Sequence, residues 1–65
     1  MLLHFQDKNH LGDFETNYDV VKHFGLDAWT RDLEEFTLAP KHDLDPYDVK
    51  VLVALSHVYG FELEQ

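Results

Sequence analysis

One segment constrains the fold of this 65-residue chain more than any other: DPYDVKVLVALSHVYG, from Asp45 to Gly60. It begins with an aspartate that can cap a helix, a proline suited to the first helical position and a second aspartate, Asp48, suited to the third. It ends at a glycine, which commonly terminates helices. These signals predict a helix from Pro46 to Tyr59.

The predicted helix is apolar around most of its circumference. Its apolar members are Val49, Val51, Leu52, Val53, Ala54, Leu55, Val58 and Tyr59. Such a helix is usually buried, so we expect it to be the central element, covered by other helices or by a second copy of the chain. A buried strand is the alternative, because VKVLV is rich in β-branched residues, but a capped run of this length favours a helix.

The segment before Gly25 carries the signals of a short helix. Thr16 and Asp19 stand three residues apart, as in a capping box. Apolar residues then recur at helical spacing until the glycine, which is a natural stop. The pattern predicts a helix over residues 17–24.

A second short helix is predicted after Asp27, which can serve as its N-cap. Trp29, Leu33 and Phe36 recur at i, i+4 and i+7, with charged residues largely on the other face. The following segment TLAPKHDLD, residues 37–45, contains a proline and shows no periodicity, which predicts a loop.

The two ends of the chain alternate weakly between apolar and polar residues. LLHFQ, residues 2–6, precedes the polar turn DKNH, and FELEQ, residues 61–65, follows the long helix. Either could be an extended arm, or the two could pair as short β-strands. The expected fold is therefore mainly α, with about three helices in one small domain spanning residues 1–65, and terminal strands as an option.

Two segments resemble parts of a known family. DVVKHFGLDAWTRDLEEF, residues 19–36, is similar to a helix-turn-helix, in which two helices meet at a turn that contains glycine. VLVALSHVYGFELEQ, residues 51–65, resembles the closing helix and tail of Cro/repressor-like domains. The resemblance implies a helix-turn-helix-like arrangement. The chain departs from the family at Arg31 and Glu34, where the family usually buries apolar residues.

The charge balance excludes several functions. Thirteen acidic residues against five basic ones give a net charge of −8. This charge favours solubility and opposes direct binding to nucleic acid or to an anionic membrane. The N-terminal MLLHFQDKNH has no basic leader and no long apolar run, so we expect neither a signal peptide nor a membrane span, and a cytoplasmic location.

No catalytic residue, metal site or cofactor is predicted, so we expect a protein that is not an enzyme. The chain has no cysteine, its five histidines lack a ligand spacing such as HExxH, and its three glycines are isolated. Ser56 and His57 are adjacent on the long helix and point about 100° apart, which prevents a nucleophile–base pair. A metal-dependent or histidine-switched protein remains a further option.

The acidic residues themselves suggest the leading hypothesis. Carboxylates three or four residues apart on a helix lie about 5–6 Å from each other, near the separation of neighbouring phosphates. Tyrosine and tryptophan dominate interaction hot spots. The candidate partner-binding residues are Asp32, Glu34, Glu35, Asp43, Asp45 and Asp48, with the aromatic residues Trp29, Tyr47 and Tyr59.

The leading hypothesis is a small acidic interaction protein that inhibits or regulates a partner protein by occupying its basic, nucleic-acid-binding surface. Nucleic-acid mimics such as viral anti-defence proteins act in this manner. One alternative is that the acidic residues only keep the chain soluble. The other is a dimerising or accessory helical domain of a transcriptional regulator or antitoxin, with the apolar helix forming the interface of a homodimer.

Overall fold

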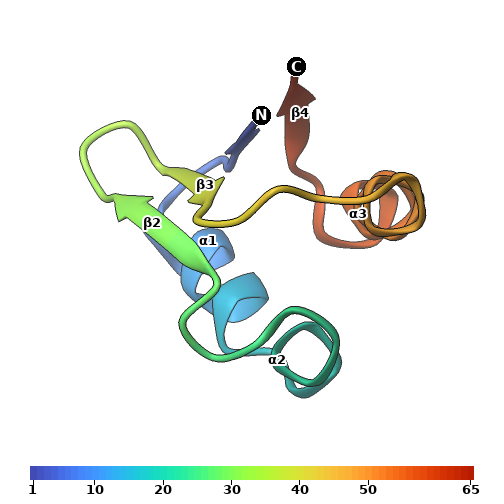
Figure 1. Cartoon of the computed structure of the whole chain (residues 1–65). Helices are drawn as coiled ribbons and strands as arrows, with labels where there is room; N and C mark the ends of the chain where they lie inside the picture. The colour runs from blue at the N-terminus through green and yellow to red at the C-terminus, as the bar shows by residue number, and fades with distance from the viewer.

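The first and last segments of the chain pair with each other as neighbouring strands. In the computed structural model, which describes all 65 residues, β1 (Leu2–His4) and β4 (Glu62–Glu64) are antiparallel, with Leu3 opposite Leu63 (Figure 1). Leu3 is completely buried and Leu63 packs against the core. The alternation at the two ends therefore places apolar residues on one face of the sheet, and of the two options that the sequence left open the structure shows the strand pairing.

The middle of the chain forms a β-hairpin where the sequence predicted a second helix and a loop. β2 (Trp29–Asp32) and β3 (Thr37–Pro40) are antiparallel. β3 also pairs with β1, so the strand order in the sheet is β2-β3-β1-β4. The helix prediction after Asp27 is therefore wrong, the loop prediction is wrong for the four residues of β3, and the helix-turn-helix resemblance does not hold for this segment.

The hairpin turn provides the physical reason for this difference. The Oδ1 atom of Asp32 accepts the backbone N–H groups of Glu34 at 3.0 Å and Glu35 at 3.1 Å, which stabilises a reversal of the chain. Phe36 completes the turn with a left-handed φ of 55°. Leu33, which helical spacing would bury, is 52% exposed. Strand pairing on both sides of β3 outweighs the local helical pattern.

An additional helix, α1 (Lys8–Glu15), follows β1. Asp7 caps it by accepting the backbone N–H of His10 at 2.8 Å. The prediction of a polar turn at DKNH is therefore wrong. Leu11 and Phe14, three residues apart, are buried and anchor α1 to the core, although most of its other residues are polar.

The next helix, α2 (Tyr18–Phe24), confirms the helix predicted over residues 17–24. Its N-cap is Asn17, whose side chain accepts the backbone N–H groups of Asp19 and Val20. The predicted cap, Thr16, instead ends α1. Asparagine caps helices as well as threonine or better, so the shift of one residue follows from local chemistry.

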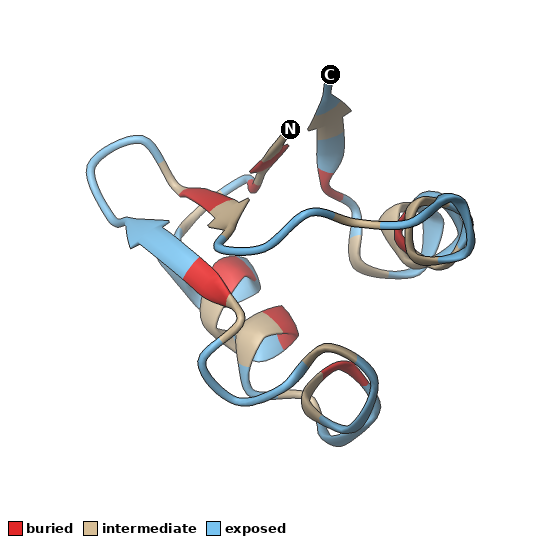
Figure 2. Ribbon diagram, in the orientation of Figure 1, coloured by how far each residue is buried: buried red, intermediate tan, exposed pale blue.

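The long helix, α3 (Pro46–Tyr59), has the predicted bounds and the predicted caps. Its predicted central position is wrong. Leu52 is its only fully buried residue, Val58 is 74% exposed, and Figure 2 shows most of the helix as exposed or half-buried. The sheet and α1 supply much of the core, so α3 lies at the side of the domain, next to β4 (Figure 1).

Phe14 stands at the centre of an aromatic core. Its ring centroid lies 4.9 Å from that of Phe61, 5.4 Å from Phe5, 5.6 Å from Tyr59 and 5.8 Å from Trp29. These contacts join α1, β2, the end of α3 and both terminal segments.

The chain is a small compact domain of mixed α/β type, with three helices and a four-stranded antiparallel sheet, instead of the expected mainly α fold. None of its helices combines the length and the apolar character that crossing a membrane requires.

Candidate functional site

The acidic residues predicted to bind a partner fall into two clusters. We define the hairpin-tip cluster as Asp32, Glu34 and Glu35. We define the α3-start cluster as Asp43, Asp45 and Asp48. In Figure 1 the turn between β2 and β3 and the helix α3 lie on opposite sides of the view. The structure therefore does not join the predicted carboxylates into a single surface row.

Three of these six carboxylates already hold local structure. Asp32 stabilises the hairpin turn, so its predicted helical spacing to Glu35 is wrong. Asp45 and Asp48 form a capping box at the start of α3. Asp48 also places its Oδ1 atom 2.8 Å from Nε2 of His23 on α2. The side chains of Glu34, Glu35 and Asp43 are exposed and have no hydrogen-bond or ion-pair partner in the chain.

The three predicted aromatic contacts divide between the core and the surface. Trp29 is 5% exposed, and the ring of Tyr59 packs edge-on against Phe14. Tyr47 is 66% exposed, and its ring centroid lies 5.8 Å from that of His23. Of the three, only Tyr47 is free to contact a partner through most of its side chain.

Most of the negative charge has no cationic neighbour. Five of the thirteen acidic residues lie within 4.0 Å of a lysine, arginine or histidine nitrogen. The other eight are all exposed, and they are distributed over helices, strands and loops. They are Asp13, Asp19, Asp32, Glu34, Glu35, Asp43, Asp45 and Glu62.

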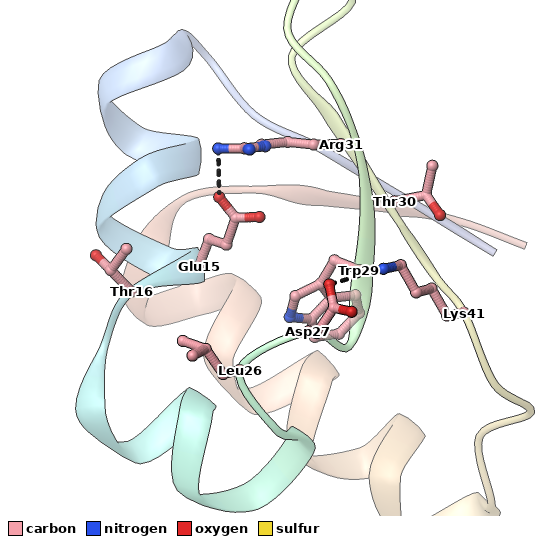
Figure 3. Close-up of a pocket in the computed structure, with 8 residues that line it drawn as sticks. All are labelled: Glu15, Thr16, Leu26, Asp27, Trp29, Thr30, Arg31 and Lys41. Carbon is pink, nitrogen blue, oxygen red and sulfur yellow. Dashed lines mark hydrogen bonds and ion pairs between the residues drawn. The ribbon is translucent and has the colours of Figure 1, made fainter.

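The largest hollow of the surface is a groove of about 530 Å³ beside β2 (Figure 3). Its walls come from the end of α1, the connection between α2 and β2, β2 itself and the residue after β3. Two ion pairs lie in these walls. Arg31 Nη1 is 3.4 Å from Glu15 Oε1, and Lys41 Nζ is 2.7 Å from Asp27 Oδ1.

The second ion pair changes the acidity of its carboxyl group. The hydrogen bond from Lys41, and then the positive charge of Lys41, hold the pKa of Asp27 below its usual value of 3.8. The Asp27 side chain is nevertheless 90% exposed. Its carboxylate can therefore meet an incoming molecule while it remains paired with the lysine.

A smaller cavity of about 130 Å³ lies between α2, β2 and the start of α3. It is lined by both members of the His23–Asp48 pair and by His42, Asp43 and Trp29. No group of three or more histidine or acidic side chains is arranged so that it could hold a metal ion. The cavity brings part of the α3-start cluster next to the aromatic core.

The groove beside β2 was not predicted from the sequence. The segment WTRD is too short to show strand periodicity, and Glu15, Arg31 and Lys41 become neighbours only when the sheet forms. No local signal marks the groove, because Pro40 is the last residue of the inner strand β3 and does not identify β2 as the edge. Comparison with protein-family models, curated proteins and solved structures found no match to this chain.

Proposed function

We propose that this chain is a small, non-enzymatic interaction protein that binds a basic surface of a partner protein and so inhibits or regulates it. One observation carries the proposal: eight carboxylates are exposed and have no cation of the chain within 4.0 Å. Charge of this kind attracts a positively charged partner and orients its approach.

The mechanism is competition. A protein surface that binds nucleic acid presents lysine and arginine to phosphate groups. The exposed carboxylates of this chain would pair with the same side chains, so the partner could not bind nucleic acid at the same time. The chain itself would not contact nucleic acid, because phosphate is repelled by its net charge of −8.

A pull-down tests this function. The full-length chain, immobilised, is exposed to a lysate of its source cell or that cell's host, and the bound proteins are identified after washes with or without duplex DNA. We expect a nucleic-acid-handling protein that DNA displaces and that salt elutes, because screened charges attract less. A partner retained in both DNA and molar salt would contradict the proposal.

A second candidate, a dimerising helical module, is supported by the surface of α3. Val53 and Val58 are exposed on this helix, and none of the thirteen acidic residues lies between Val49 and Phe61. The exposed side of α3 thus combines Val53, Ala54 and Val58 with Lys50 and His57, and a surface without carboxylates suits contact with a second copy of the chain better than the acidic remainder does. Sedimentation over a wide concentration range tests it, and a monomer at every concentration would exclude it.

A further inference from the structure

β2 is an edge strand whose outer backbone groups have no partner in the sheet. The backbone N–H of Lys41 donates to the carbonyl oxygen of Ala28 at 2.9 Å. This bond determines which residues of β2 direct their N–H and C=O groups toward β3 and which direct them away from it. Because bonded and non-bonded positions alternate in antiparallel strands, Thr30 bonds to β3, whereas the N–H and C=O groups of Trp29 and Arg31 face outward. Pro40, which has no N–H to donate, lies opposite Trp29, as expected for a pair that exchanges no ladder hydrogen bond.

The groove described above lies along this free edge. Successive side chains of a strand point to opposite faces, so Arg31 and Thr30 leave β2 in opposite directions, as Figure 3 shows. Both line the groove, together with Trp29. The groove is therefore bordered by residues from both faces of β2, beside the edge where an added strand would lie.

Trp29 gives an independent indication of a ligand. Its indole ring is buried, with the residue only 5% exposed, and its Nε1–H has no acceptor in the chain. A buried donor without a partner is unfavourable, and native proteins rarely leave one unsatisfied. A carbonyl oxygen of a segment lying in the groove could accept this hydrogen bond after a small movement of the groove wall.

The charge around the edge defines the kind of segment that fits. Asp27 precedes β2, Glu15 lines the groove, and the hairpin-tip cluster follows β2 directly. These five carboxylates outnumber the two cations of the groove, Arg31 and Lys41. The region therefore favours a basic segment and disfavours an acidic one, including β2 of a second copy. Antiparallel pairing of two β2 strands would place the hairpin-tip cluster of each copy beside Asp27 of the other, and parallel pairing would bring the two hairpin-tip clusters together.

The other edge of the sheet is less suitable. β4 carries Glu62 and Glu64, and charged side chains protect an edge strand from pairing. No cavity of the domain is lined by a residue of β4. The two edges are therefore not equivalent, and β2 is the one with room for another strand.

We propose that an extended, basic segment of the partner protein adds to the sheet as a fifth strand along the free edge of β2. This inference rests on the proposed function, and it specifies how the partner is held. Main-chain hydrogen bonds to Trp29 and Arg31 would supply the docking geometry, and lysine or arginine side chains of the segment would meet the surrounding carboxylates.

The test uses a synthetic octapeptide of alternating lysine and valine and the full ¹⁵N-labelled chain. Amide hydrogen exchange is followed by NMR with and without the peptide. We expect exchange of the Trp29 and Arg31 amides to slow by roughly tenfold or more at saturation, because each gains an acceptor. The Thr30 amide, already bonded to β3, serves as the internal reference and should change much less.

A matched peptide separates hydrogen bonding from charge. The same octapeptide N-methylated at its four central residues keeps every lysine but loses the central backbone donors. We expect it to bind roughly tenfold to a hundredfold more weakly, since about two hydrogen bonds are lost. Equal binding of the two peptides, or protection that spares Trp29 and Arg31, would overturn edge docking.

A pair of variants repeats the test on the protein side. Arg31→Pro removes the outward N–H of β2 and leaves the bonds to β3, whereas Arg31→Ala removes the same side chain and keeps the N–H. We expect the octapeptide to bind Arg31→Pro roughly tenfold more weakly than Arg31→Ala. Equal affinities in two folded variants would also overturn edge docking; if circular dichroism shows that Arg31→Pro is unfolded, the N-methylated peptide decides.

The outcomes also separate this inference from the proposed function. If both octapeptides bind equally and salt releases both, edge docking fails while attraction to basic partners stands. If neither octapeptide binds, edge docking again fails, and the pull-down decides the proposed function independently.

Discussion

His23 on α2 and Asp48 on α3 lie 2.8 Å apart, measured from Nε2 to Oδ1, although 25 residues separate them in the sequence. The other carboxylate oxygen of Asp48 accepts the backbone N–H of Asp45, at 3.4 Å. A single side chain thus ties the first turn of α3 to α2. Carboxylates that make such hydrogen bonds stabilise the fold, whereas exposed carboxylates without partners are available to bind another molecule.

This division predicts different effects of removing two neighbouring aspartates. Asp45→Ala should lower the free energy of unfolding by about 1 kcal/mol, because the N-cap of α3 is lost. Asp43→Ala, at an exposed residue without a partner, should change it by less than about 0.5 kcal/mol. Urea denaturation measures both. Equal stability losses would mean that Asp45 does not act as a cap.

The two faces of α3 should respond differently to truncation. Leu52→Ala should cost about 2–5 kcal/mol, because Leu52 is completely buried. Val58→Ala should be nearly neutral, within about 0.5 kcal/mol, because Val58 is 74% exposed. Denaturation at low protein concentration provides the comparison. A large loss for Val58→Ala that depends on protein concentration would instead reveal a subunit interface on α3.

Two glycines should have opposite effects when replaced by alanine. Gly60 ends α3 with a φ of 70°, where a side chain is strained, so Gly60→Ala should destabilise the fold by about 1 kcal/mol. Gly12 lies inside α1 with open space around its α-carbon, so Gly12→Ala should stabilise the fold by about 0.5–1 kcal/mol. Thermal unfolding of both variants checks the signs, and the same sign for both would show that one assignment is wrong.

The pKa of Asp27 should depend on Lys41. Lys41→Met removes the hydrogen bond and charge that lower this pKa, so the pKa should rise toward 3.8. The pKa of Asp7 should not change, because the backbone N–H of His10 is the main cause of its lowering. Titration of the carboxyl carbons by NMR between about pH 6 and pH 2 measures both values. An unchanged pKa of Asp27 would exclude the ion pair in solution.

The sign of the associated stability effect follows from the same shift. A folded-state pKa below the unfolded one contributes stability that is present above the unfolded pKa, and this stability is lost as the pH falls through the folded pKa. For Asp27 and Asp7 the loss therefore begins only in acid, near and below pH 3.8. In Lys41→Met the contribution of Asp27 should be smaller, because only the charge of His42 still lowers its pKa.

Local signals in the sequence predicted some elements accurately. Both ends of α3 were predicted from its capping residues, because capping depends on a few adjacent residues. These residues are Asp45, Pro46, Asp48 and Gly60. The alternation at the two ends of the chain allowed the β1–β4 pair but left it open against an extended arm. In both cases the residues that decide the structure lie within the element or show its period directly.

The other predictions failed where distant contacts decide the structure. The helical spacing of Trp29, Leu33 and Phe36 could not reveal that β3 would be enclosed between β1 and β2. The burial of α3 was overestimated for the same reason, because the sheet and α1 contribute much of the core. The acidic residues were identified as candidates from the sequence, but the free edge of β2 and its groove exist only in the folded chain.

The pairing of β1 with β4 has a consequence for how the chain folds. These strands stand at the two ends of the sequence, so their ladder closes a loop that includes nearly all the residues of the chain. Contacts between residues so distant in sequence slow folding, because the entropy of loop closure opposes them before they form. We therefore expect the helices and the β2–β3 hairpin to form early and the joining of the two ends to limit the folding rate.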